Sequence, residues 1–276
     1  MFRIAYNSLV LEQGSGYSVS NLGGCDIPPI RTSSQQLSTS HGGNIWKQLY
    51  AMRTITIEGL VYASDYSTYE ELKRKLSSTF SIADDNVLQI RKWDGEEKHI
   101  NAKVTTPPRY IDGTGRMKIG EFMIELLCSD PFFYDTGETT GTAVLATSTG
   151  GSPVPMPVPM PIGGIVGNKV ILNNSGEIAV YPTVTITGTV DNPTVTNVTT
   201  GESFTVTDSF TGNDTLQIYQ DQSGLYVLKN GVNSMSNFLG SFFTLGLGNN
   251  DIRFTALEHS ASALLSITFS NKYKII

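Results

Sequence analysis

The sequence predicts a mainly β protein with two domains, residues 1–135 and 136–276. The chain has 276 residues, which is enough for about two domains of roughly 150 residues each. Charged residues are less frequent after Asp135. Residues 1–135 contain 14 of the 19 Lys and Arg and 16 of the 25 Asp and Glu. Short apolar runs fill the second part, whereas the first part combines strand patterns with a single helical one.

Two segments of the first domain alternate polar and apolar residues, as half-buried strands do. They are residues 53–60, which include Gly59, and residues 120–128. The expected core side of the second strand includes Cys128, which we interpret as a packing residue rather than a reactive thiol. The opposite side of that strand carries Glu121, Met123 and Glu125.

A helix and a hairpin lie between those two strands. Ser67-Thr68-Tyr69-Glu70 has the form of a capping box and predicts a helix over residues 67–80. Residues 87–93 and 99–104 flank Asp94-Gly95, a pair that favours the positive φ of a tight hairpin turn. The core face of the helix is expected to consist of Tyr69, Leu72, Leu76 and Phe80.

The second domain is predicted to be an antiparallel β-sandwich or barrel. Its apolar runs are mostly four to six residues long, are bounded by turn residues, and include no amphipathic helix. The predicted strands are Lys169–Leu172, Thr183–Ile186, Thr194–Val198, Ser203–Val206, Thr215–Tyr219, Leu225–Leu228, Asp251–Thr255 and Leu264–Phe269.

Proline occupies every second position from Pro153 to Pro161, within the extended segment 152–162 of the second domain. Proline fixes φ and has no N–H donor, so one edge of this segment cannot form a β ladder. Two interpretations stay open: a stiff surface strand, or an arm of roughly 28 Å that lies on a neighbouring subunit.

The net charge of −6 contains no block of like charges, which argues against a basic nucleic-acid footprint. No secretion signal or membrane-spanning helix is expected. Cys25 and Cys128 are too few for a disulfide framework or a thiolate metal cluster.

No catalytic, cofactor-binding or metal-binding residue is predicted, and the protein is not expected to be an enzyme. The histidines His41, His99 and His259 lack ligand spacing, and no P-loop, zinc, calcium or nucleophile-elbow motif is found. The carboxylate pairs Asp84-Asp85 and Glu96-Glu97 are interpreted as solvated turn charges, because adjacent residues on an extended chain point apart.

A sandwich domain raises the alternative of saccharide binding. Sugar rings usually stack on large aromatic faces, yet Trp46 and Trp93 both lie in the first domain. The second domain offers Tyr181, Tyr219 and Tyr226, for which packing at a strand is the more common role.

An ordered set of segments resembles the distal tail protein (Dit) family of bacteriophages with long, non-contractile tails. The set includes the strand at 53–59, the helix at 67–80 and Asp130-Pro131-Phe132-Phe133 at the end of the first domain. It continues with Asn174-Ser175-Gly176, Tyr181–Gly188, Val198–Phe204, Lys229-Asn230-Gly231 and Gly248–Phe254.

This resemblance implies a structural baseplate hub without catalytic activity. The first domain would be β-sandwich-like with one helix and would close into a homohexameric ring, and the second would be a galectin-like sandwich. The ring would join the tail tube to the tail-tip protein, the tail-associated lysin, and DNA would pass through it without specific binding. The protein would be assembled in the host cytoplasm and reside at the distal end of the virion tail. The alternative is a carbohydrate-binding or host-adhesion module with a host saccharide as partner.

The function of a DNA channel allows the charge of the side chains that line it to be predicted. A basic lumen would hold the phosphate backbone, so a conduit through which DNA slides should be neutral or acidic. The channel-facing candidates are Asp84, Asp85, Glu96 and Glu97. The alternative is that these acidic residues only keep a large assembly soluble.

Overall fold

The computed structural model describes residues 2–37, 39–82, 86–112, 118–145, 168–259 and 263–276. The chain forms two compact units. Unit 1 comprises residues 1–136 together with 272–276, and unit 2 comprises residues 137–271. The prediction that residues 272–276 belong to the second domain is wrong, because these last five residues return to unit 1.

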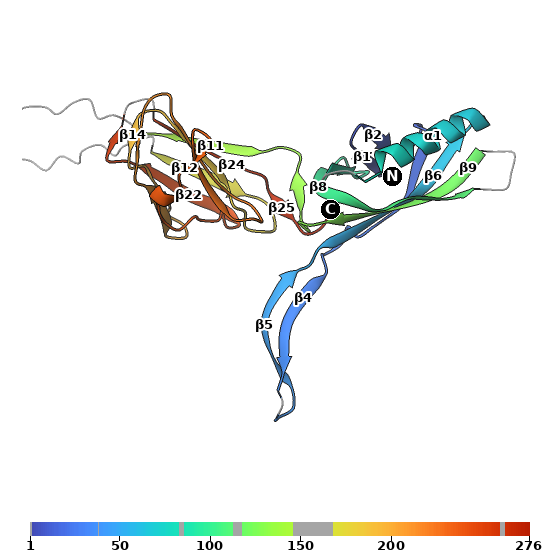
Figure 1. Cartoon of the computed structure of the whole chain (residues 1–276), viewed down its shortest axis with the longest axis horizontal. Coiled ribbons are helices and arrows are strands. Elements are labelled where there is room, and N and C mark those ends of the chain that lie inside the picture. The colour runs from blue at the N-terminus through green and yellow to red at the C-terminus, as the bar shows by residue number, and fades with distance from the viewer. Residues whose placement is uncertain (1, 38, 83–85, 113–117, 146–167, 260–262) are drawn as a thin grey trace, which may run out of the picture. The chain divides into compact units, whose positions relative to one another are not determined.

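Unit 1 contains one α-helix and most of the longer strands (Figure 1). Its elements are β1 (Arg3–Tyr6), β2 (Leu9–Leu11), β3 (Tyr17–Gly23), β4 (Ile30–Gln36), β5 (Gly43–Tyr50), β6 (Arg53–Ala63), α1 (Tyr66–Thr79), β7 (Asn86–Arg91), β8 (Glu97–Asp112), β9 (Lys118–Cys128), β10 (Phe133–Asp135) and β25 (Lys272–Tyr273).

The main sheet of unit 1 has the strand order β2-β1-β7-β8-β9-β6-β3, and β10 and β25 join it beside β8. Strand β8 connects the two halves of this sheet. It pairs with β7 through Glu97–Ala102 and with β9 through Lys103–Asp112. Its register shifts around Pro107-Pro108, where the ladder is interrupted and the missing N–H groups are tolerated. The strand predicted over residues 99–104 covers only part of β8.

Helix α1 covers one face of the sheet. The predicted apolar face is confirmed: Tyr69, Leu76 and Phe80 are buried, and Leu72 packs against the same core. The predicted cap at Ser67 is wrong, because the Asp65 carboxylate accepts the Thr68 N–H at 2.9 Å.

The other strands predicted in the first domain begin and end close to the ends of the observed strands β6, β7 and β9. The Asp94-Gly95 turn is confirmed, with φ of 90° at Gly95. Strand β9 buries Cys128 as expected, and this burial raises the pKa of the thiol to about 12, so the side chain packs as an uncharged group. Strand β6 runs through Gly59 to Ala63.

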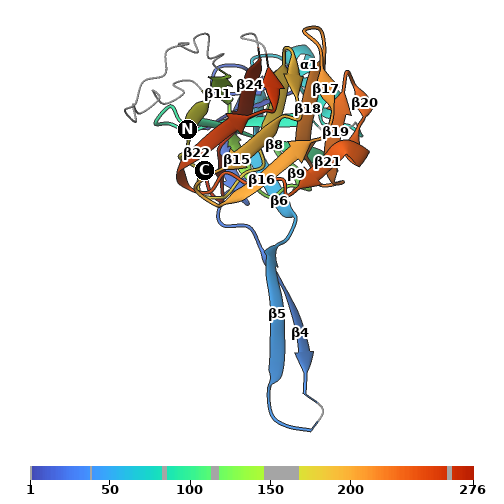
Figure 2. The same cartoon turned by 90° about the vertical axis from the view of Figure 1, so that its left-hand side faces the viewer.

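The β4–β5 hairpin has no counterpart among the strands predicted from the sequence. In Figures 1 and 2 its two strands extend away from the main sheet of unit 1. Every residue of both strands is exposed except Tyr50, which is partly exposed. The segment is rich in Ser, Gln and Gly and shows no alternation, because neither face of the hairpin is buried in the chain.

Unit 2 is an all-β unit apart from one 3-10 turn, η1 (Met235–Asn237). Its strands are β11 (Thr139–Val144), β12 (Lys169–Asn174), β13 (Thr183–Thr187), β14 (Val190–Asp191), β15 (Thr194–Asn197), β16 (Glu202–Val206), β17 (Ser209–Phe210), β18 (Thr215–Gln220), β19 (Leu225–Lys229), β20 (Val232–Asn233), β21 (Phe238–Gly240), β22 (Gly248–Thr255), β23 (Glu258–His259) and β24 (Leu264–Phe269).

Two antiparallel sheets of unit 2 enclose one apolar core, which confirms the predicted sandwich. One sheet has the order β11-β24-β13-β18-β19-β20 and the other has the order β12-β22-β15-β16-β21. Side chains from both sheets, such as Ile186, Ile218 and Phe254, form a single buried cluster. The proline-rich segment 152–162 lies outside the described residues.

A buried arginine connects distant parts of unit 1. Arg53 is 1% exposed at the start of β6. Its Nε donates to the Pro131 carbonyl at 2.8 Å, its Nη1 donates to the Gly24 carbonyl at 2.9 Å, and its Nη2 donates to the Lys274 carbonyl. The guanidinium also lies over the Phe133 ring, 4.4 Å from its centroid. One side chain therefore holds the segments before β4, after β9 and at the C-terminus.

We predict that Arg53→Met lowers the free energy of unfolding of unit 1 by about 2–5 kcal/mol, because three carbonyls lose their donor. Chemical denaturation, with hydrogen exchange to assign the loss to unit 1, measures the effect. Arg109→Met is the matched control, since Arg109 is exposed on the same unit. Equal unfolding free energies for the two variants would contradict the structural role of Arg53.

Candidate functional site

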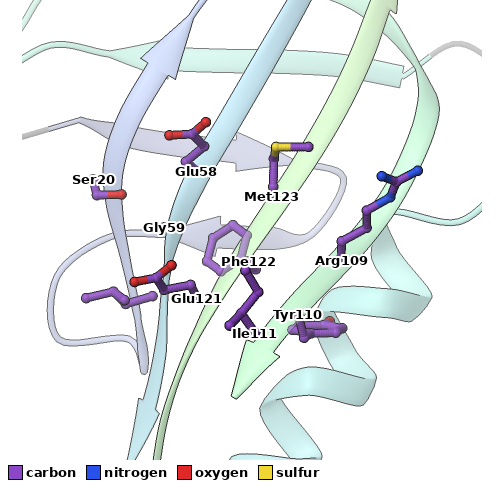
Figure 3. A pocket seen from close by; sticks show the side chains of 10 residues that line it. Ser20, Glu58, Gly59, Arg109, Tyr110, Ile111, Glu121, Phe122 and Met123 are labelled. Atoms are coloured by element: carbon purple, nitrogen blue, oxygen red, sulfur yellow. The ribbon is translucent and has the colours of Figure 1, made fainter. Parts of the chain in front are cut away.

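The free face of the unit 1 sheet carries a groove of about 740 Å³ (Figure 3). Strands β3, β6, β8 and β9 form its floor. The opposite face of the same strands packs on the core and on α1, where the hydroxyls of Tyr17 and Tyr110 donate to helix carbonyls at 2.9 Å. The side chains that line the groove include Glu58, Leu60, Arg109, Ile111, Glu121 and Met123.

The floor of the groove depends on Gly59. A Cβ at this position would lie 2.7 Å from the Phe122 ring and 2.4 Å from the Ser18 carbonyl oxygen. A side chain there would therefore push Phe122 and β3 away from β6. Gly59 lets the Phe122 ring pack directly beneath the strand, which keeps the sheet continuous under the groove.

The groove and its surroundings are acidic. The strand register places Glu58 opposite Met123, Leu60 opposite Glu121 and Thr56 opposite Glu125, so the three glutamates share one face. Asn21 Nδ2 donates to Glu58 at 3.2 Å, and the Thr106 hydroxyl donates to Glu125 at 2.6 Å. Among the described residues that line the groove, Arg109 is the one cation, and the register places Lys103, opposite Leu127, on the same face beyond it. This face presents carboxylates to whatever lies in front of it.

Of the predicted channel residues, Glu96 and Glu97 are described, and neither lines this groove. Glu96 forms ion pairs with Lys98 at 3.0 Å and Lys92 at 3.6 Å, and Glu97 lies 3.9 Å from Arg3. Asp84 and Asp85 lie outside the described residues. Exposure of these four carboxylates to a channel stays a prediction. The sequence did contain a signal for the groove, since the alternation in 120–128 already separated Glu121, Met123 and Glu125 from the core side.

Unit 2 presents a different surface on the outer face of its six-stranded sheet. The Tyr219 and Tyr226 rings stack with centroids 5.0 Å apart and planes 14° apart. The sheet register continues this row through Thr183 and Thr268 to Thr140. The row offers two aromatic rings and hydroxyl groups, and none of its side chains is charged.

Neither a metal site nor a membrane-spanning helix emerges from the described residues. In that part of the chain, no three His, Cys, Asp or Glu side chains are grouped to hold a metal ion. None of its helices has the length and apolar character required to cross a membrane.

Two family models match successive parts of the chain. Residues 12–128 match the phage tail protein RIFT-related domain. Residues 175–273 match the siphovirus-type tail component, C-terminal domain. The first match covers the part of unit 1 that contains the groove, and the second covers most of the described sandwich.

Solved structures show the same fold over the full length of the chain. The Dit protein of phage SPP1, described as a paradigm of the hub adsorption apparatus in phages that infect Gram-positive bacteria, matches with a TM-score of 0.70 and 14% identity, covering 99% of each chain. A chain of the phage P2 baseplate in its activated conformation with Ca matches with a TM-score of 0.51 and 8% identity, covering 100% of this chain and 99% of the other. No curated protein sequence matches the chain. With both family models matching in order and the SPP1 Dit fold spanning both units, the chain is a phage tail component that belongs to the siphophage distal tail protein (Dit) family.

Proposed function

We propose that six copies of this protein form a ring, a baseplate hub that joins the tail tube to the tail-tip protein and leaves a channel for DNA. Membership of the Dit family supports the role in the baseplate. The tail-tip partner would be the tail-associated lysin. The hub would be assembled in the host cytoplasm and remain at the distal end of the virion tail, and its own role would be structural rather than catalytic.

The observation that carries the proposal is the uncovered acidic face of the unit 1 sheet. Its other face is covered by α1 and the core, so a ring of unit 1 copies can turn this face inward while the apolar core stays covered. DNA passing such a wall would meet three carboxylates, Glu58, Glu121 and Glu125, which outnumber the cations Arg109 and Lys103 on the same face. An acidic wall repels the phosphate backbone and leaves DNA free to slide.

We expect the purified protein to assemble into particles of about 180 kDa, which is six copies of 30.0 kDa. Native mass spectrometry and light scattering after size exclusion measure this mass. The measurement is repeated with the tail tube and tail-tip proteins, since a ring can require its neighbours to close. A chain that stays monomeric both alone and with these proteins would contradict the hub proposal.

The charge of the proposed channel gives a second prediction. Assembled wild-type protein should show no salt-dependent binding of duplex DNA, whereas Glu121→Lys should acquire it through added phosphate contacts. Glu71→Lys is the matched control, because Glu71 is an exposed glutamate on α1, outside the groove. Equal DNA binding by the two variants at every salt concentration would place the channel elsewhere.

A second candidate function is saccharide binding by unit 2, favoured by the row of Tyr226, Tyr219 and threonine hydroxyls. Stacked aromatic rings and uncharged hydrogen-bonding groups suit a neutral sugar. We expect Tyr219→Ala to abolish any binding of host cell-wall oligosaccharides in calorimetric titrations, while Tyr181→Ala, at an exposed tyrosine elsewhere in unit 2, leaves it intact. Absence of binding by the wild-type protein would leave unit 2 without this role.

A further inference from the structure

Unit 2 gathers two of its three cations at one place. Its residues 137–271 contain nine Asp and Glu, and their Lys and Arg are Lys169, Lys229 and Arg253. The Asp208 carboxylate binds the Lys229 ammonium at 2.9 Å. Lys169 of β12 lies directly opposite Arg253 of β22, and both residues are exposed on the outer face of the five-stranded sheet. An acidic unit therefore has one face on which cations meet.

These opposed cations are only partly neutralised. Ile252 and Phe254 lie in the core, so Arg253 between them points outward. The Asp251 carboxylate, on the same face, forms an ion pair with Lys169, whereas Arg253 forms no ion pair with any described residue. Like charges directly opposite on neighbouring strands are destabilising. Two cations and one carboxylate leave positive charge on this face, and an anion is the ligand that it favours.

Hydroxyl groups continue the face beside these charges. The register extends from Arg253 through Thr196 to Ser203 across strands β22, β15 and β16, which lie side by side in Figure 2. A second row of hydroxyl groups lies two residues further along these strands, at a spacing of about 7 Å. That row consists of Thr255, Thr194 and Thr205. The face thus offers a cationic position next to a band of hydrogen-bonding groups.

The second row borders a hollow of about 380 Å³. Besides its three threonines, the hollow is lined by Asn192, Thr207, Ala256 and Leu257, so none of the described residues around it is charged. Leu257 is 74% exposed and gives the hollow an apolar side. Hydroxyl and amide groups beside an apolar surface suit a sugar ring, which has hydroxyl groups at its rim and C–H groups on its faces.

We propose that the outer face of the five-stranded sheet binds an anionic glycan, a chain of sugar or polyol units that carry phosphate or carboxylate groups. The guanidinium of Arg253, with Lys169 opposite, binds the anionic group, since its planar fork of donors matches both phosphate and carboxylate. The threonine hydroxyls bind the ring in the hollow. This face belongs to a different sheet from the Tyr219 and Tyr226 row, and its ligand is charged rather than neutral.

The hydroxyl groups favour a glycan over other polyanions. Duplex DNA brings phosphates, but its deoxyribose rings have no free hydroxyl group within the strand, so the groups that line the hollow would lose water without gaining partners. An acidic peptide would satisfy Arg253 and leave the threonine hydroxyls in the same position. Only a ligand with both an anionic group and hydroxyl groups satisfies both rows.

Calorimetric titration of the full chain tests the ligand class. The probes are oligomers of glycerol phosphate, galacturonic acid and glucose, together with a short DNA duplex. We expect at least one of the two anionic oligomers to bind, with an affinity that falls as salt is added. Binding of one of them alone identifies the anionic group as phosphate or carboxylate. Failure of both, or equally tight binding of the glucose oligomer or the duplex, overturns the proposal.

Substitutions with matched controls test the two rows. Arg253→Met should weaken binding of the anionic oligomer by roughly tenfold or more, and Thr255→Val by about two- to tenfold, as loss of a charged and of a neutral hydrogen bond does. The controls are Arg74→Met, at an exposed arginine on α1, and Thr142→Val, at an exposed threonine on β11. All four residues are exposed, so melting temperatures should match that of the wild type. Equal losses in Arg253→Met and Arg74→Met overturn the proposal.

Hydrogen exchange with the bound oligomer locates the site. Protection should rise in β15, β16 and β22, and Tyr219→Ala should bind the anionic oligomer as tightly as the wild type does. Protection confined to β18 and β19, or loss of binding in Tyr219→Ala with Arg253→Met unaffected, assigns the ligand to the other sheet and overturns the proposal. A wild-type chain that stays monomeric would contradict the six-copy ring and leave this test unchanged, because every residue of the face belongs to one chain.

Discussion

The guanidinium of Arg53 is the contact on which unit 1 depends. It joins carbonyls of Gly24, Pro131 and Lys274, which lie far apart in the chain. A buried cation requires hydrogen-bond partners, and a planar fork of donors can satisfy several carbonyls at once. Burial lowers the pKa of this guanidinium from its usual value, yet a group of such high pKa remains charged and so keeps all its donors.

The C-terminal residues complete unit 1 rather than unit 2. Strand β25 pairs with β10, and the Lys272 ammonium lies 3.2 Å from the Asp130 carboxylate. Lys98 extends this cluster through the Asp135 carboxylate at 3.1 Å. The segment that leaves unit 1 and the segment that returns to it are therefore fixed by the same small sheet. The sheet of unit 1 is thus completed by residues that follow unit 2 in the chain.

The two faces of the unit 1 sheet have different tasks. Successive residues of β6 and β9 point to opposite faces of the sheet. Helix α1 and the core cover only one of these two faces. The other face is free to carry glutamates, because no packing partner has to tolerate them. The hairpin shows the same division more strongly, since every residue of its two strands except Tyr50, which contacts Phe132, is exposed.

Local sequence patterns determined much of this protein by themselves. The spacing of Tyr69, Leu76 and Phe80 specified the buried side of α1, and Asp94-Gly95 specified a hairpin turn, because both depend on residues close in the chain. The alternation in 120–128 separated Cys128 from Glu121 and Glu125 for the same reason. The ordered motifs also indicated the Dit family, which the family models confirm.

Tertiary structure alone decided which of these surfaces are covered. From the sequence, Arg53 is expected to be a polar residue on the exposed side of a strand. Its burial is possible because the carbonyls of Pro131 and Lys274 accept its hydrogen bonds. The β4–β5 hairpin has no apolar alternation, because its residues do not pack on this chain's core. Glu97 is predicted to face a channel from its charge alone, and Arg3 of the distant strand β1 pairs with it. Periodicity assigns a residue to a face, but only contacts between distant segments determine what that face meets.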